Sequence, residues 1–291
     1  MTNDNKNPAI AVIGGDLRQI RAAEYLMQAG YSVRIYGFDQ YKLPKDCLLA
    51  DSLEQAVSGV DYVILPLPWS RDGVILNAPY SSADIELEQI YASVMPWMTV
   101  LGGKIDCCSF ADRGIRAIDY FAQESFQILN AVPTAEGAIQ IAMEESPITI
   151  SQSRCLVVGY GRIGKVLAQR LSGLHASVCV SARKSEDFAW IRASGYDSIK
   201  TCDIGQRIGE FDFIFNTVPV RVISEAELQQ VKRGALLIDL ASAPGGMDME
   251  SAQKYGVQTV WSLSLPGKVA PDTAGKILSQ VLADVIQETQ R

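Results

Sequence analysis

Short runs of apolar residues alternate with segments of helical periodicity along the whole chain of 291 residues. Such runs are typical of strands buried on both faces, and their alternation with helices is typical of parallel α/β sheets. In the first half the runs are Ala9–Ile13, Val33–Tyr36, Tyr62–Leu65, Thr99–Leu101 and Ile115–Ile118. In the second half they are Cys155–Val158, Val178–Ser181, Phe213–Phe215, Leu236–Asp239 and Thr259–Trp261. The pattern predicts an α/β fold of two doubly wound parallel-sheet domains, Rossmann-like or flavodoxin-like.

The boundary between the domains is expected in the segment 130–137, where Pro133 stops one segment and Thr134 can cap a helix that runs to about Glu145. The last segment, 273–288, carries a strong helical stripe of apolar residues, and no strand remains for it to follow. We therefore expect this C-terminal helix to pack back on the first domain. The predicted domains are residues 1–130 with the helix 272–291, and residues 131–271, with a ligand cleft between them.

Composition excludes several classes of protein. Hydrophobic residues make up 48% of the chain and charged residues 20%, so it can bury a core. The net charge of −7 and the dispersed basic residues argue against nucleic-acid binding. The chain has no apolar run long enough for a membrane span, and its polar start lacks the apolar segment of a signal peptide, so a cytoplasmic location is expected.

The cysteines give no sign of a metal site. They lie at positions 47, 107, 108, 155, 179 and 202, without a CxxC pair or a cluster at metal-ligand spacing. We expect them to be reduced and mostly buried, with Cys155 and Cys179 inside strands.

A GxGxxG motif directly follows the apolar run Cys155–Val158 and opens a helical segment. In this context Gly159 permits a tight turn, Gly161 lets a pyrophosphate approach the backbone, and Gly164 allows close packing of the helix on the strand. The motif therefore predicts a bound dinucleotide. The cofactor contacts expected here are Gly159, Gly161, Arg162, Ile163 and Gly164.

The end of the next strand indicates which dinucleotide. NAD sites usually place an acidic residue there for the ribose 2′-hydroxyl, but this chain has Ser181, Arg183 and Lys184. A hydroxyl and two cations suit the 2′-phosphate of NADP. The alternative is that the two cations are the solvated start of the next helix.

Other loops at predicted carboxyl ends of strands also face the ligand edge of a sheet. Gly14 and Gly15 do not complete a GxGxxG spacing, so a second dinucleotide is not expected. Asp16 caps the next helix, or else Arg18 meets an anionic substrate. The remaining loops supply further expected cofactor contacts at Thr217, Val218, Pro219 and Leu240.

The single histidine argues against one common mechanism. Hydroxy acid dehydrogenases generally use a histidine at the cleft as acid and base. His175 is instead expected at the far end of the helix that follows the glycine loop, as a loop or cap residue.

At this point the chain resembles the family of dipicolinate synthase A subunits, from the bacterial sporulation enzyme that makes pyridine-2,6-dicarboxylate. The resemblance covers essentially the whole chain. The motifs most specific to this family are Val132-Pro-Thr-Ala-Glu-Gly137 and Leu265-Pro-Gly-Lys-Val-Ala-Pro271 with Thr273-Ala-Gly275. The less specific motifs are Ala11–Asp16, Gly159–Gly164, Ala182–Ser185, Asp239–Ser242 and Pro244–Gly246.

The resemblance implies NADP-linked oxidation of dihydrodipicolinate together with a flavoprotein-like B subunit, in the mother cell of a sporulating bacterium. Loss of a hydride and a proton makes the ring aromatic, so a carboxylate base or water suffices. The substrate is a dianion and needs cations or helix starts. The candidates are Arg18, Lys104, Arg162 and Lys268.

Three residues near expected helix starts complete the candidate site. Glu136 is the candidate acid/base, or else an acid that complements the helix dipole. Thr134 is expected to bind a substrate carboxylate and Thr273 the cofactor, unless both are plain N-caps.

Two other functions stay open at this point. One is an NADP-dependent dehydrogenase of another small dicarboxylate or imino acid. The other is a non-catalytic subunit that binds NADP while a partner does the chemistry. Self-association is also left open.

Overall fold

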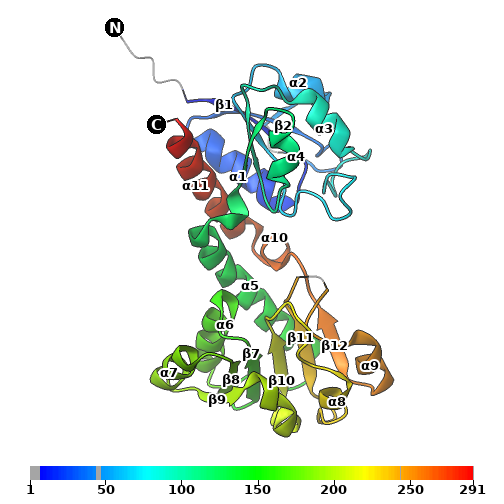
Figure 1. The fold of residues 1–291 in the computed structure, drawn as a ribbon, viewed down its shortest axis with the longest axis vertical. Coiled ribbons are helices and arrows are strands. Elements are labelled where there is room, and N and C mark those ends of the chain that lie inside the picture. The colour runs from blue at the N-terminus through cyan, green and yellow to red at the C-terminus, as the bar shows by residue number, and fades with distance from the viewer. Residues whose placement is uncertain (1–6, 44–46, 243, 291) are drawn as a thin grey trace. The chain divides into compact units, whose positions relative to one another are not determined.

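The computed structural model describes residues 7–43, 47–242 and 244–290. These residues form two compact units (Figure 1). Unit 1 contains the described residues up to Asn130 and those from Pro266 onward, and unit 2 contains Ala131–Leu265. No helix among the described residues is long and apolar enough to cross a membrane.

Unit 1 is built on a six-stranded parallel sheet in the order β3-β2-β1-β4-β5-β6. Its strands are β1 (Ala9–Ile13), β2 (Ser32–Tyr36), β3 (Leu48–Leu49), β4 (Tyr62–Ile64), β5 (Thr99–Gly102) and β6 (Arg116–Asp119). The five apolar runs of this half are all strands. The apolar pattern does not predict β3, an edge strand of two exposed leucines. The order reverses between β1 and β4, the switch point where such sheets usually bind ligands.

Helices cover both faces of this sheet. They are α1 (Leu17–Gln28), α2 (Leu53–Val57), α3 (Leu87–Ser93), α4 (Cys107–Ala111), the 3₁₀ turn Tyr120–Ala122 and α11 (Pro271–Thr289). The short helix α10 (Leu265–Val269) begins at the last residue of unit 2 and precedes α11. The apolar side of α11 packs with α1 in one core, as the C-terminal stripe predicts (Figure 1). Gly275 makes this approach close, because a Cβ atom there would overlap the Cβ of Arg21.

Unit 2 repeats the same topology, with the strand order β12-β11-β10-β7-β8-β9. Its strands are β7 (Arg154–Val158), β8 (Ser177–Ala182), β9 (Asp197–Lys200), β10 (Phe213–Asn216), β11 (Leu236–Asp239) and β12 (Gln258–Trp261). Its helices are α6 (Arg162–Gly173), α7 (Ser185–Ala193), α8 (Glu225–Leu228), α9 (Met249–Lys254) and the 3₁₀ turns Thr201–Gln206 and Ile208–Glu210. The prediction of two doubly wound sheets is confirmed, and β9 is the strand that the pattern of this half does not predict.

One predicted helix start is wrong. The helix α5 runs from Glu124 to Glu145 without interruption and contains Pro133 in its interior. A proline inside a helix removes one backbone hydrogen bond and costs about 3 kcal/mol, which tertiary packing can offset. Small apolar residues bury one side of α5 around the proline, at Ala131, Ala135 and Ala138. Thr134 is therefore not an N-cap.

The prediction for the cysteines is half correct. All six are free, but only Cys155 and Cys179 are buried. Burial raises the pKa of these two thiols to about 11 and about 12. Cys108 and Cys202 are exposed because they lie in a short helix and a 3₁₀ turn at the surface rather than in a strand.

Candidate functional site

The turn between β7 and α6 has the geometry that the glycine spacing predicts. Gly159 has a φ of +97°, which residues with a side chain rarely adopt. A Cβ atom at Gly164 would overlap the carbonyl oxygen of Gly159, so glycine alone lets α6 lie this close. At Gly161 none of the described residues outside its immediate chain neighbours comes within 4 Å of the place a Cβ would take. The space above the turn is open.

The start of α6 directs backbone donors at that space. Gly161 is the N-cap and has no side chain to accept from the first backbone N–H groups of the helix, which belong to Arg162, Ile163 and Gly164. The N-terminus of a helix of 12 residues also carries partial positive charge. A pyrophosphate fits this turn, since it finds room, donors and no competing capping side chain.

Ser181 has a different role from the one expected. Its side chain is fully buried, and its Oγ accepts a hydrogen bond from the backbone N of Gly159 at 3.3 Å. The hydroxyl of Thr201 also lies 3.5 Å from it. The hydroxyl of Ser181 supports the glycine turn from inside the fold, so it cannot reach a 2′-phosphate. This part of the NADP prediction is corrected.

A cavity of about 480 Å³ lies at the carboxyl ends of β8 and β9. Arg183 and Lys200 are the two cations in its lining, and both are exposed. Lys184 is exposed beside them, as the N-cap of α7. The end of β8 carries no carboxylate, in keeping with the sequence. Sequence patterns do not point to Lys200, because it lies on the one strand of this unit that the apolar pattern does not mark.

The loops after β10 and β11 meet the glycine turn at the same edge. The hydroxyl of Thr217 donates to the carbonyl of Val158 at 2.9 Å, and Val218 packs against Gly159. Pro219 is exposed, whereas Leu240 is buried. Their predicted contact with a cofactor stays a prediction.

A buried amide and a buried carboxylate fix these two loops. Asn216 donates from Nδ2 to Oδ1 of Asp239 at 2.7 Å, and both residues are almost fully buried. Asp239 also accepts from the backbone N of Ala241 at 3.0 Å and of Gly246 at 2.8 Å. The carboxylate is thereby paired without a cation. The sequence places both residues at strand ends, but it gives no signal of their pairing.

In unit 1 the switch point holds Arg18. Arg18 is 3% exposed, and its guanidinium donates to both carboxylate oxygens of Asp16, with Nη2 to Oδ2 at 2.8 Å. Nη2 also donates to the carbonyl of Leu67 at 2.9 Å. Burial would lower the pKa of Arg18, but the charge and hydrogen bonds of Asp16 raise it above its usual value. The other guanidinium nitrogen, Nη1, forms no hydrogen bond with any of the described residues. It is not fully buried either, because it is absent from the buried side-chain atoms that lack a partner among these residues. The arrangement leaves one donor of a fixed cation for an anion.

Two other predicted cations, Lys104 and Lys268, lie near the same edge, whereas Arg162 belongs to α6 of unit 2. Lys104 follows β5 with a φ of +56°, and its backbone N donates to Asp119 at 2.9 Å. Lys268 is exposed on α10, where a Cβ atom at Gly267 would lie 2.6 Å from Oδ2 of Asp16. α10 therefore touches the carboxylate that holds Arg18.

The glycine pair after β1 does not form a second dinucleotide turn. A Cβ atom at Gly14 would lie 2.8 Å from Cδ2 of Leu76 and 3.0 Å from the Cβ of Ala78. Asp16 caps α1 with its own carboxylate, which accepts from the backbone N of Arg18. Apolar side chains and a negative charge thus occupy the place a pyrophosphate would take.

The structure moves Glu136 and Thr134 away from a helix start. Glu136 lies in the middle of α5 and pairs with Arg170 of α6 at 3.4 Å, with both side chains largely exposed. Arg170 belongs to the last turn of α6, at the end remote from the glycine turn. Thr134 is buried in α5. The placement of both residues at a helix start is wrong, and their roles in catalysis and binding stay predictions.

Two further placements concern Thr273 and His175. Thr273 is exposed in the first turn of α11, but the N-cap is Ala270, so the alternative of a plain N-cap is wrong. His175 follows the C-cap of α6 with a φ of +63°, and its carbonyl accepts from the backbone N of Gln152 at 3.0 Å. The prediction that His175 ends this helix is confirmed.

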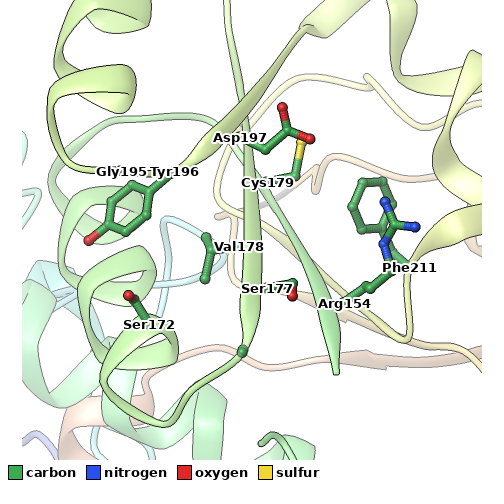
Figure 2. A pocket seen from close by; sticks show the side chains of 10 residues that line it. Arg154, Ser172, Ser177, Val178, Cys179, Gly195, Tyr196, Asp197 and Phe211 are labelled. Carbon is green, nitrogen blue, oxygen red and sulfur yellow. The ribbon is translucent and has the colours of Figure 1, made fainter. Parts of the chain in front are cut away.

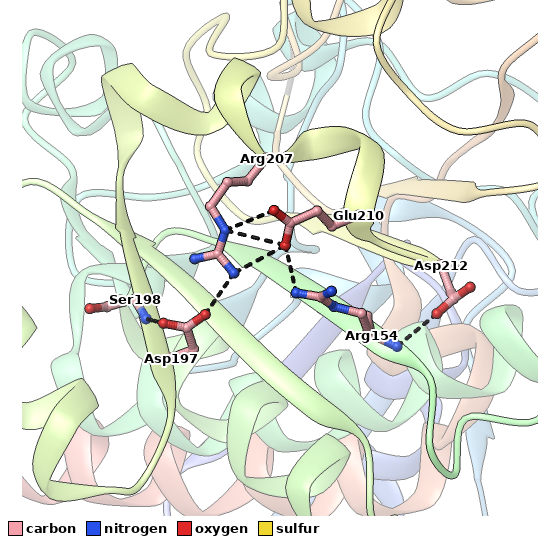
Figure 3. A network of polar contacts seen from close by, with 6 residues as sticks. All are labelled: Arg154, Asp197, Ser198, Arg207, Glu210 and Asp212. Carbon is pink, nitrogen blue, oxygen red and sulfur yellow. Dashed lines mark hydrogen bonds and ion pairs between the residues drawn. The ribbon is translucent and has the colours of Figure 1, made fainter.

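A second cavity, of about 290 Å³, lies at the opposite edge of the sheet of unit 2 (Figure 2). Its lining includes Arg154, Cys179 and Asp197. The charges around it satisfy one another, because Glu210 binds both Arg154 and Arg207, and Arg207 also binds Asp197 at 2.8 Å (Figure 3). Ligands of open α/β sheets bind at the carboxyl ends of the strands, and this edge is formed by the amino ends. We assign the network a structural role.

Comparisons with known proteins match the two halves of the chain separately. Residues 9–121 match the model of the N-terminal domain of the dipicolinate synthase A subunits. Residues 128–245 match the model of the D-isomer specific 2-hydroxyacid dehydrogenase, NAD binding domain. Unit 2 thus contains a nicotinamide-binding domain of the dehydrogenase type.

Whole-chain similarity is more specific. The curated A subunit of dipicolinate synthase from Bacillus subtilis (strain 168) is 30% identical over 286 residues, which cover 97% of this chain and 96% of that protein. The solved structure of the A subunit from Bacillus halodurans has a TM-score of 0.87 at 28% identity, covering 96% of this chain and 97% of the other. The solved structure from Bacillus subtilis has a TM-score of 0.85 at 29% identity, covering 98% and 97%. The chain belongs to the family of dipicolinate synthase A subunits.

Proposed function

We propose that this chain oxidises dihydrodipicolinate to dipicolinate with NADP, as the A subunit of a dipicolinate synthase that works with a flavoprotein-like B subunit. The observation that carries the proposal is the open glycine turn of unit 2, with backbone donors at the start of α6 that no N-cap side chain binds, in a chain that belongs to this family along its length. Unit 2 is then the NADP-binding domain, and unit 1 the substrate domain.

Different residues of unit 2 bind different parts of the cofactor in this proposal. The backbone N–H groups of Arg162, Ile163 and Gly164 bind the pyrophosphate. The 2′-phosphate lies by Arg183 and Lys184, after a strand that does not end on the acidic residue usual in NAD sites. The loops after β10 and β11 contact the rest of the cofactor. NADP, when bound, accepts a hydride from a ring carbon of the substrate.

Unit 1 supplies the charge that a dicarboxylate needs. Arg18 is held by Asp16 and Leu67 before any ligand arrives, so its Nη1 donates to a substrate carboxylate without loss of side-chain freedom. Lys104 and Lys268 add positive charge near the same edge. Binding a dianion beside one buried and two exposed cations is favourable, since charge-assisted hydrogen bonds contribute about 1.5–3 kcal/mol each.

The proton released in the reaction goes to water in this proposal. Dihydrodipicolinate loses a hydride to NADP and a proton from the neighbouring ring atom, and the product is aromatic, so the step runs downhill without a strong base. Glu136, the base expected from the sequence, is exposed and paired with Arg170, which gives it no ordered place in this step.

Turnover by the purified chain tests the proposal. We expect dihydrodipicolinate and NADP to give an increase in reduced-nicotinamide absorbance, larger with NADP than with NAD, when the chain is assayed alone or with its flavoprotein-like partner. Other small dicarboxylates and imino acids serve as the substrate panel. Preference for another substrate would contradict the assignment to dihydrodipicolinate. NADP binding without turnover in both assays would mean that the chain binds NADP without catalysing the reaction.

A further inference from the structure

The cavity at the carboxyl ends of β8 and β9 brings together residues from two neighbouring strands. In the parallel ladder Lys200 lies directly opposite Ala182, and Arg183 follows Ala182 in the chain. Arg183 and Lys200 therefore leave adjacent strands at the same edge, and both line the same cavity of about 480 Å³. Two positively charged side chains therefore line the same cavity.

These two cations are not used by the fold. Among the described residues neither the side chain of Arg183 nor that of Lys200 forms a hydrogen bond or an ion pair, whereas the side chains of Arg154, Arg170 and Arg207 are all paired. One carboxylate, Glu227, lines the cavity, and it accepts hydrogen bonds from the backbone N and hydroxyl of Ser224. Such a pair of unpaired cations is ready to bind an anion from outside the chain.

The cavity is joined to the glycine turn by hydrogen bonds. Thr201, the residue after Lys200, donates to the hydroxyl of Ser181, and Ser181 in turn accepts from the backbone N of Gly159. Ala182 lies between Ser181 and Arg183 in the chain, and its small buried side chain lines the cavity. An anion at Arg183 and Lys200 is therefore placed one strand to the side of the pyrophosphate site.

We propose that Arg183 and Lys200 together bind the 2′-phosphate of NADP, with Lys200 as a residue that determines the preference for NADP over NAD. The proposal rests on the proposed function in one respect, that the dinucleotide is NADP. The planar fork of Arg183 bonds two phosphate oxygens, and the ammonium of Lys200 neutralises the remaining charge. The uncharged ribose 2′-hydroxyl of NAD gains little binding free energy from either cation.

Calorimetry with 2′,5′-ADP and 5′-ADP on the full chain tests this. Lys200→Met keeps the length of the side chain and removes its charge, and we expect it to weaken 2′,5′-ADP binding roughly tenfold or more, with 5′-ADP affinity within about twofold. Lys200→Gln is the second variant. Lys276→Met, at an exposed lysine of α11, is the matched control and leaves both affinities unchanged.

The outcomes separate the two proposals. If the unmodified chain binds 5′-ADP as tightly as 2′,5′-ADP, the assignment of NADP fails and this inference fails with it. If the unmodified chain prefers 2′,5′-ADP but Lys200→Met and Lys200→Gln keep that preference, the role of Lys200 alone is overturned.

Cys202 gives an independent measurement of the location. It is exposed and lines the same cavity, whereas the exposed Cys108 belongs to unit 1. We expect 2′,5′-ADP to slow alkylation of Cys202 at least severalfold and to leave Cys108 unaffected. Equal alkylation of Cys202 with and without 2′,5′-ADP, at saturating ligand, would place the phosphate elsewhere.

Discussion

At the scale of single residues, polar side chains at the ends of the strands of unit 2 hold its ligand-binding loops through hydrogen bonds inside the fold. Ser181 is correctly placed at the end of β8, yet its hydroxyl faces inward to the glycine turn. Asn216 and Asp239 end neighbouring strands and bond each other across 23 positions of sequence. No local pattern reports a partner that far away. The glycine roles were predictable because each depends on its own backbone and one neighbouring turn.

Arg18 gives the first prediction. Arg18→Ala removes the fixed donor of unit 1, and we expect dipicolinate binding to weaken about tenfold or more while 2′,5′-ADP affinity is unchanged. The same change leaves Asp16, which is 21% exposed, without its partner, so the free energy of unfolding should fall by about 3 kcal/mol. Calorimetry and urea unfolding measure the two effects.

Arg21→Ala is the matched control, because Arg21 lies on the same helix and pairs with Glu24 at the surface. It should leave dipicolinate affinity as it is. Unaltered dipicolinate binding in folded Arg18→Ala would remove Arg18 from the substrate site.

At the scale of elements, the apolar pattern finds strands that contain a run of several apolar residues, including the edge strands β6 and β12, which have no buried residue. Ten apolar runs are strands, and the two missed strands, β3 and β9, lie at sheet edges. β9 has the sequence Asp-Ser-Ile-Lys with one apolar residue, Ile199, so it contains no apolar run. Missing β9 also meant missing Lys200. The wrongly predicted helix start at Thr134 has a different cause. Pro133 is a local signal for the end of a helix, but tertiary packing, which cannot be predicted from the local sequence, outweighs it and α5 continues through the proline.

The end of α6 gives the second prediction. His175 adopts a left-handed conformation there, which costs a residue with a side chain roughly 1–2 kcal/mol, while glycine loses about 0.5–1 kcal/mol of chain entropy on folding. His175→Gly should therefore raise the free energy of unfolding by up to about 1 kcal/mol, and His175→Val should lower it. Urea unfolding measures both.

The same residue tests the mechanism. A helix of 12 residues separates His175 from the glycine turn by about 18 Å, so His175→Asn should change turnover less than threefold. A fall of two or more orders of magnitude in a folded variant would restore a histidine mechanism.

The network at the amino ends of the strands of unit 2 gives the third prediction. Hydrogen bonds from Arg207 lower the pKa of Asp197 and of Glu210 (Figure 3). Carboxyl groups with a lowered folded pKa stabilise the fold above their unfolded pKa, and this contribution is lost as the pH falls through the folded pKa. The difference in unfolding free energy between the unmodified chain and Arg207→Met should be constant from pH 7 to about 5 and shrink below about pH 4.

Urea unfolding at several pH values measures this difference. Arg192→Met, at an exposed arginine in the last turn of α7, is the control and should show no such trend. A difference for Arg207→Met that stays constant down to about pH 3 would mean that these carboxylates gain nothing from the guanidinium.

At the scale of the whole molecule, sequence order and spatial order differ at the C-terminus. The helix α11 comes after every strand of unit 2, yet its apolar stripe is part of the core of unit 1 (Figure 1). The stripe and the lack of a following strand made this predictable. The close approach was not, because it depends on Gly275 meeting Arg21 and Ala22 of α1.

Removal of α11 gives the last prediction. Six of its apolar side chains are buried in the core of unit 1, namely Ile277, Leu278, Val281, Leu282, Val285 and Ile286. At about 1.5–3 kcal/mol each, their burial contributes an amount comparable to the roughly 5–15 kcal/mol by which a domain is usually stable. A chain that ends at residue 270 should therefore lose the fold of unit 1 and its affinity for dipicolinate, and keep its affinity for 2′,5′-ADP through unit 2. Hydrogen exchange and calorimetry measure these effects, with Lys276→Met on the exposed side of α11 as the control. Dipicolinate binding that survives the truncation would contradict this prediction. It would show that unit 1 stays folded without α11, and that its core depends less on α11 than the contacts of this helix indicate.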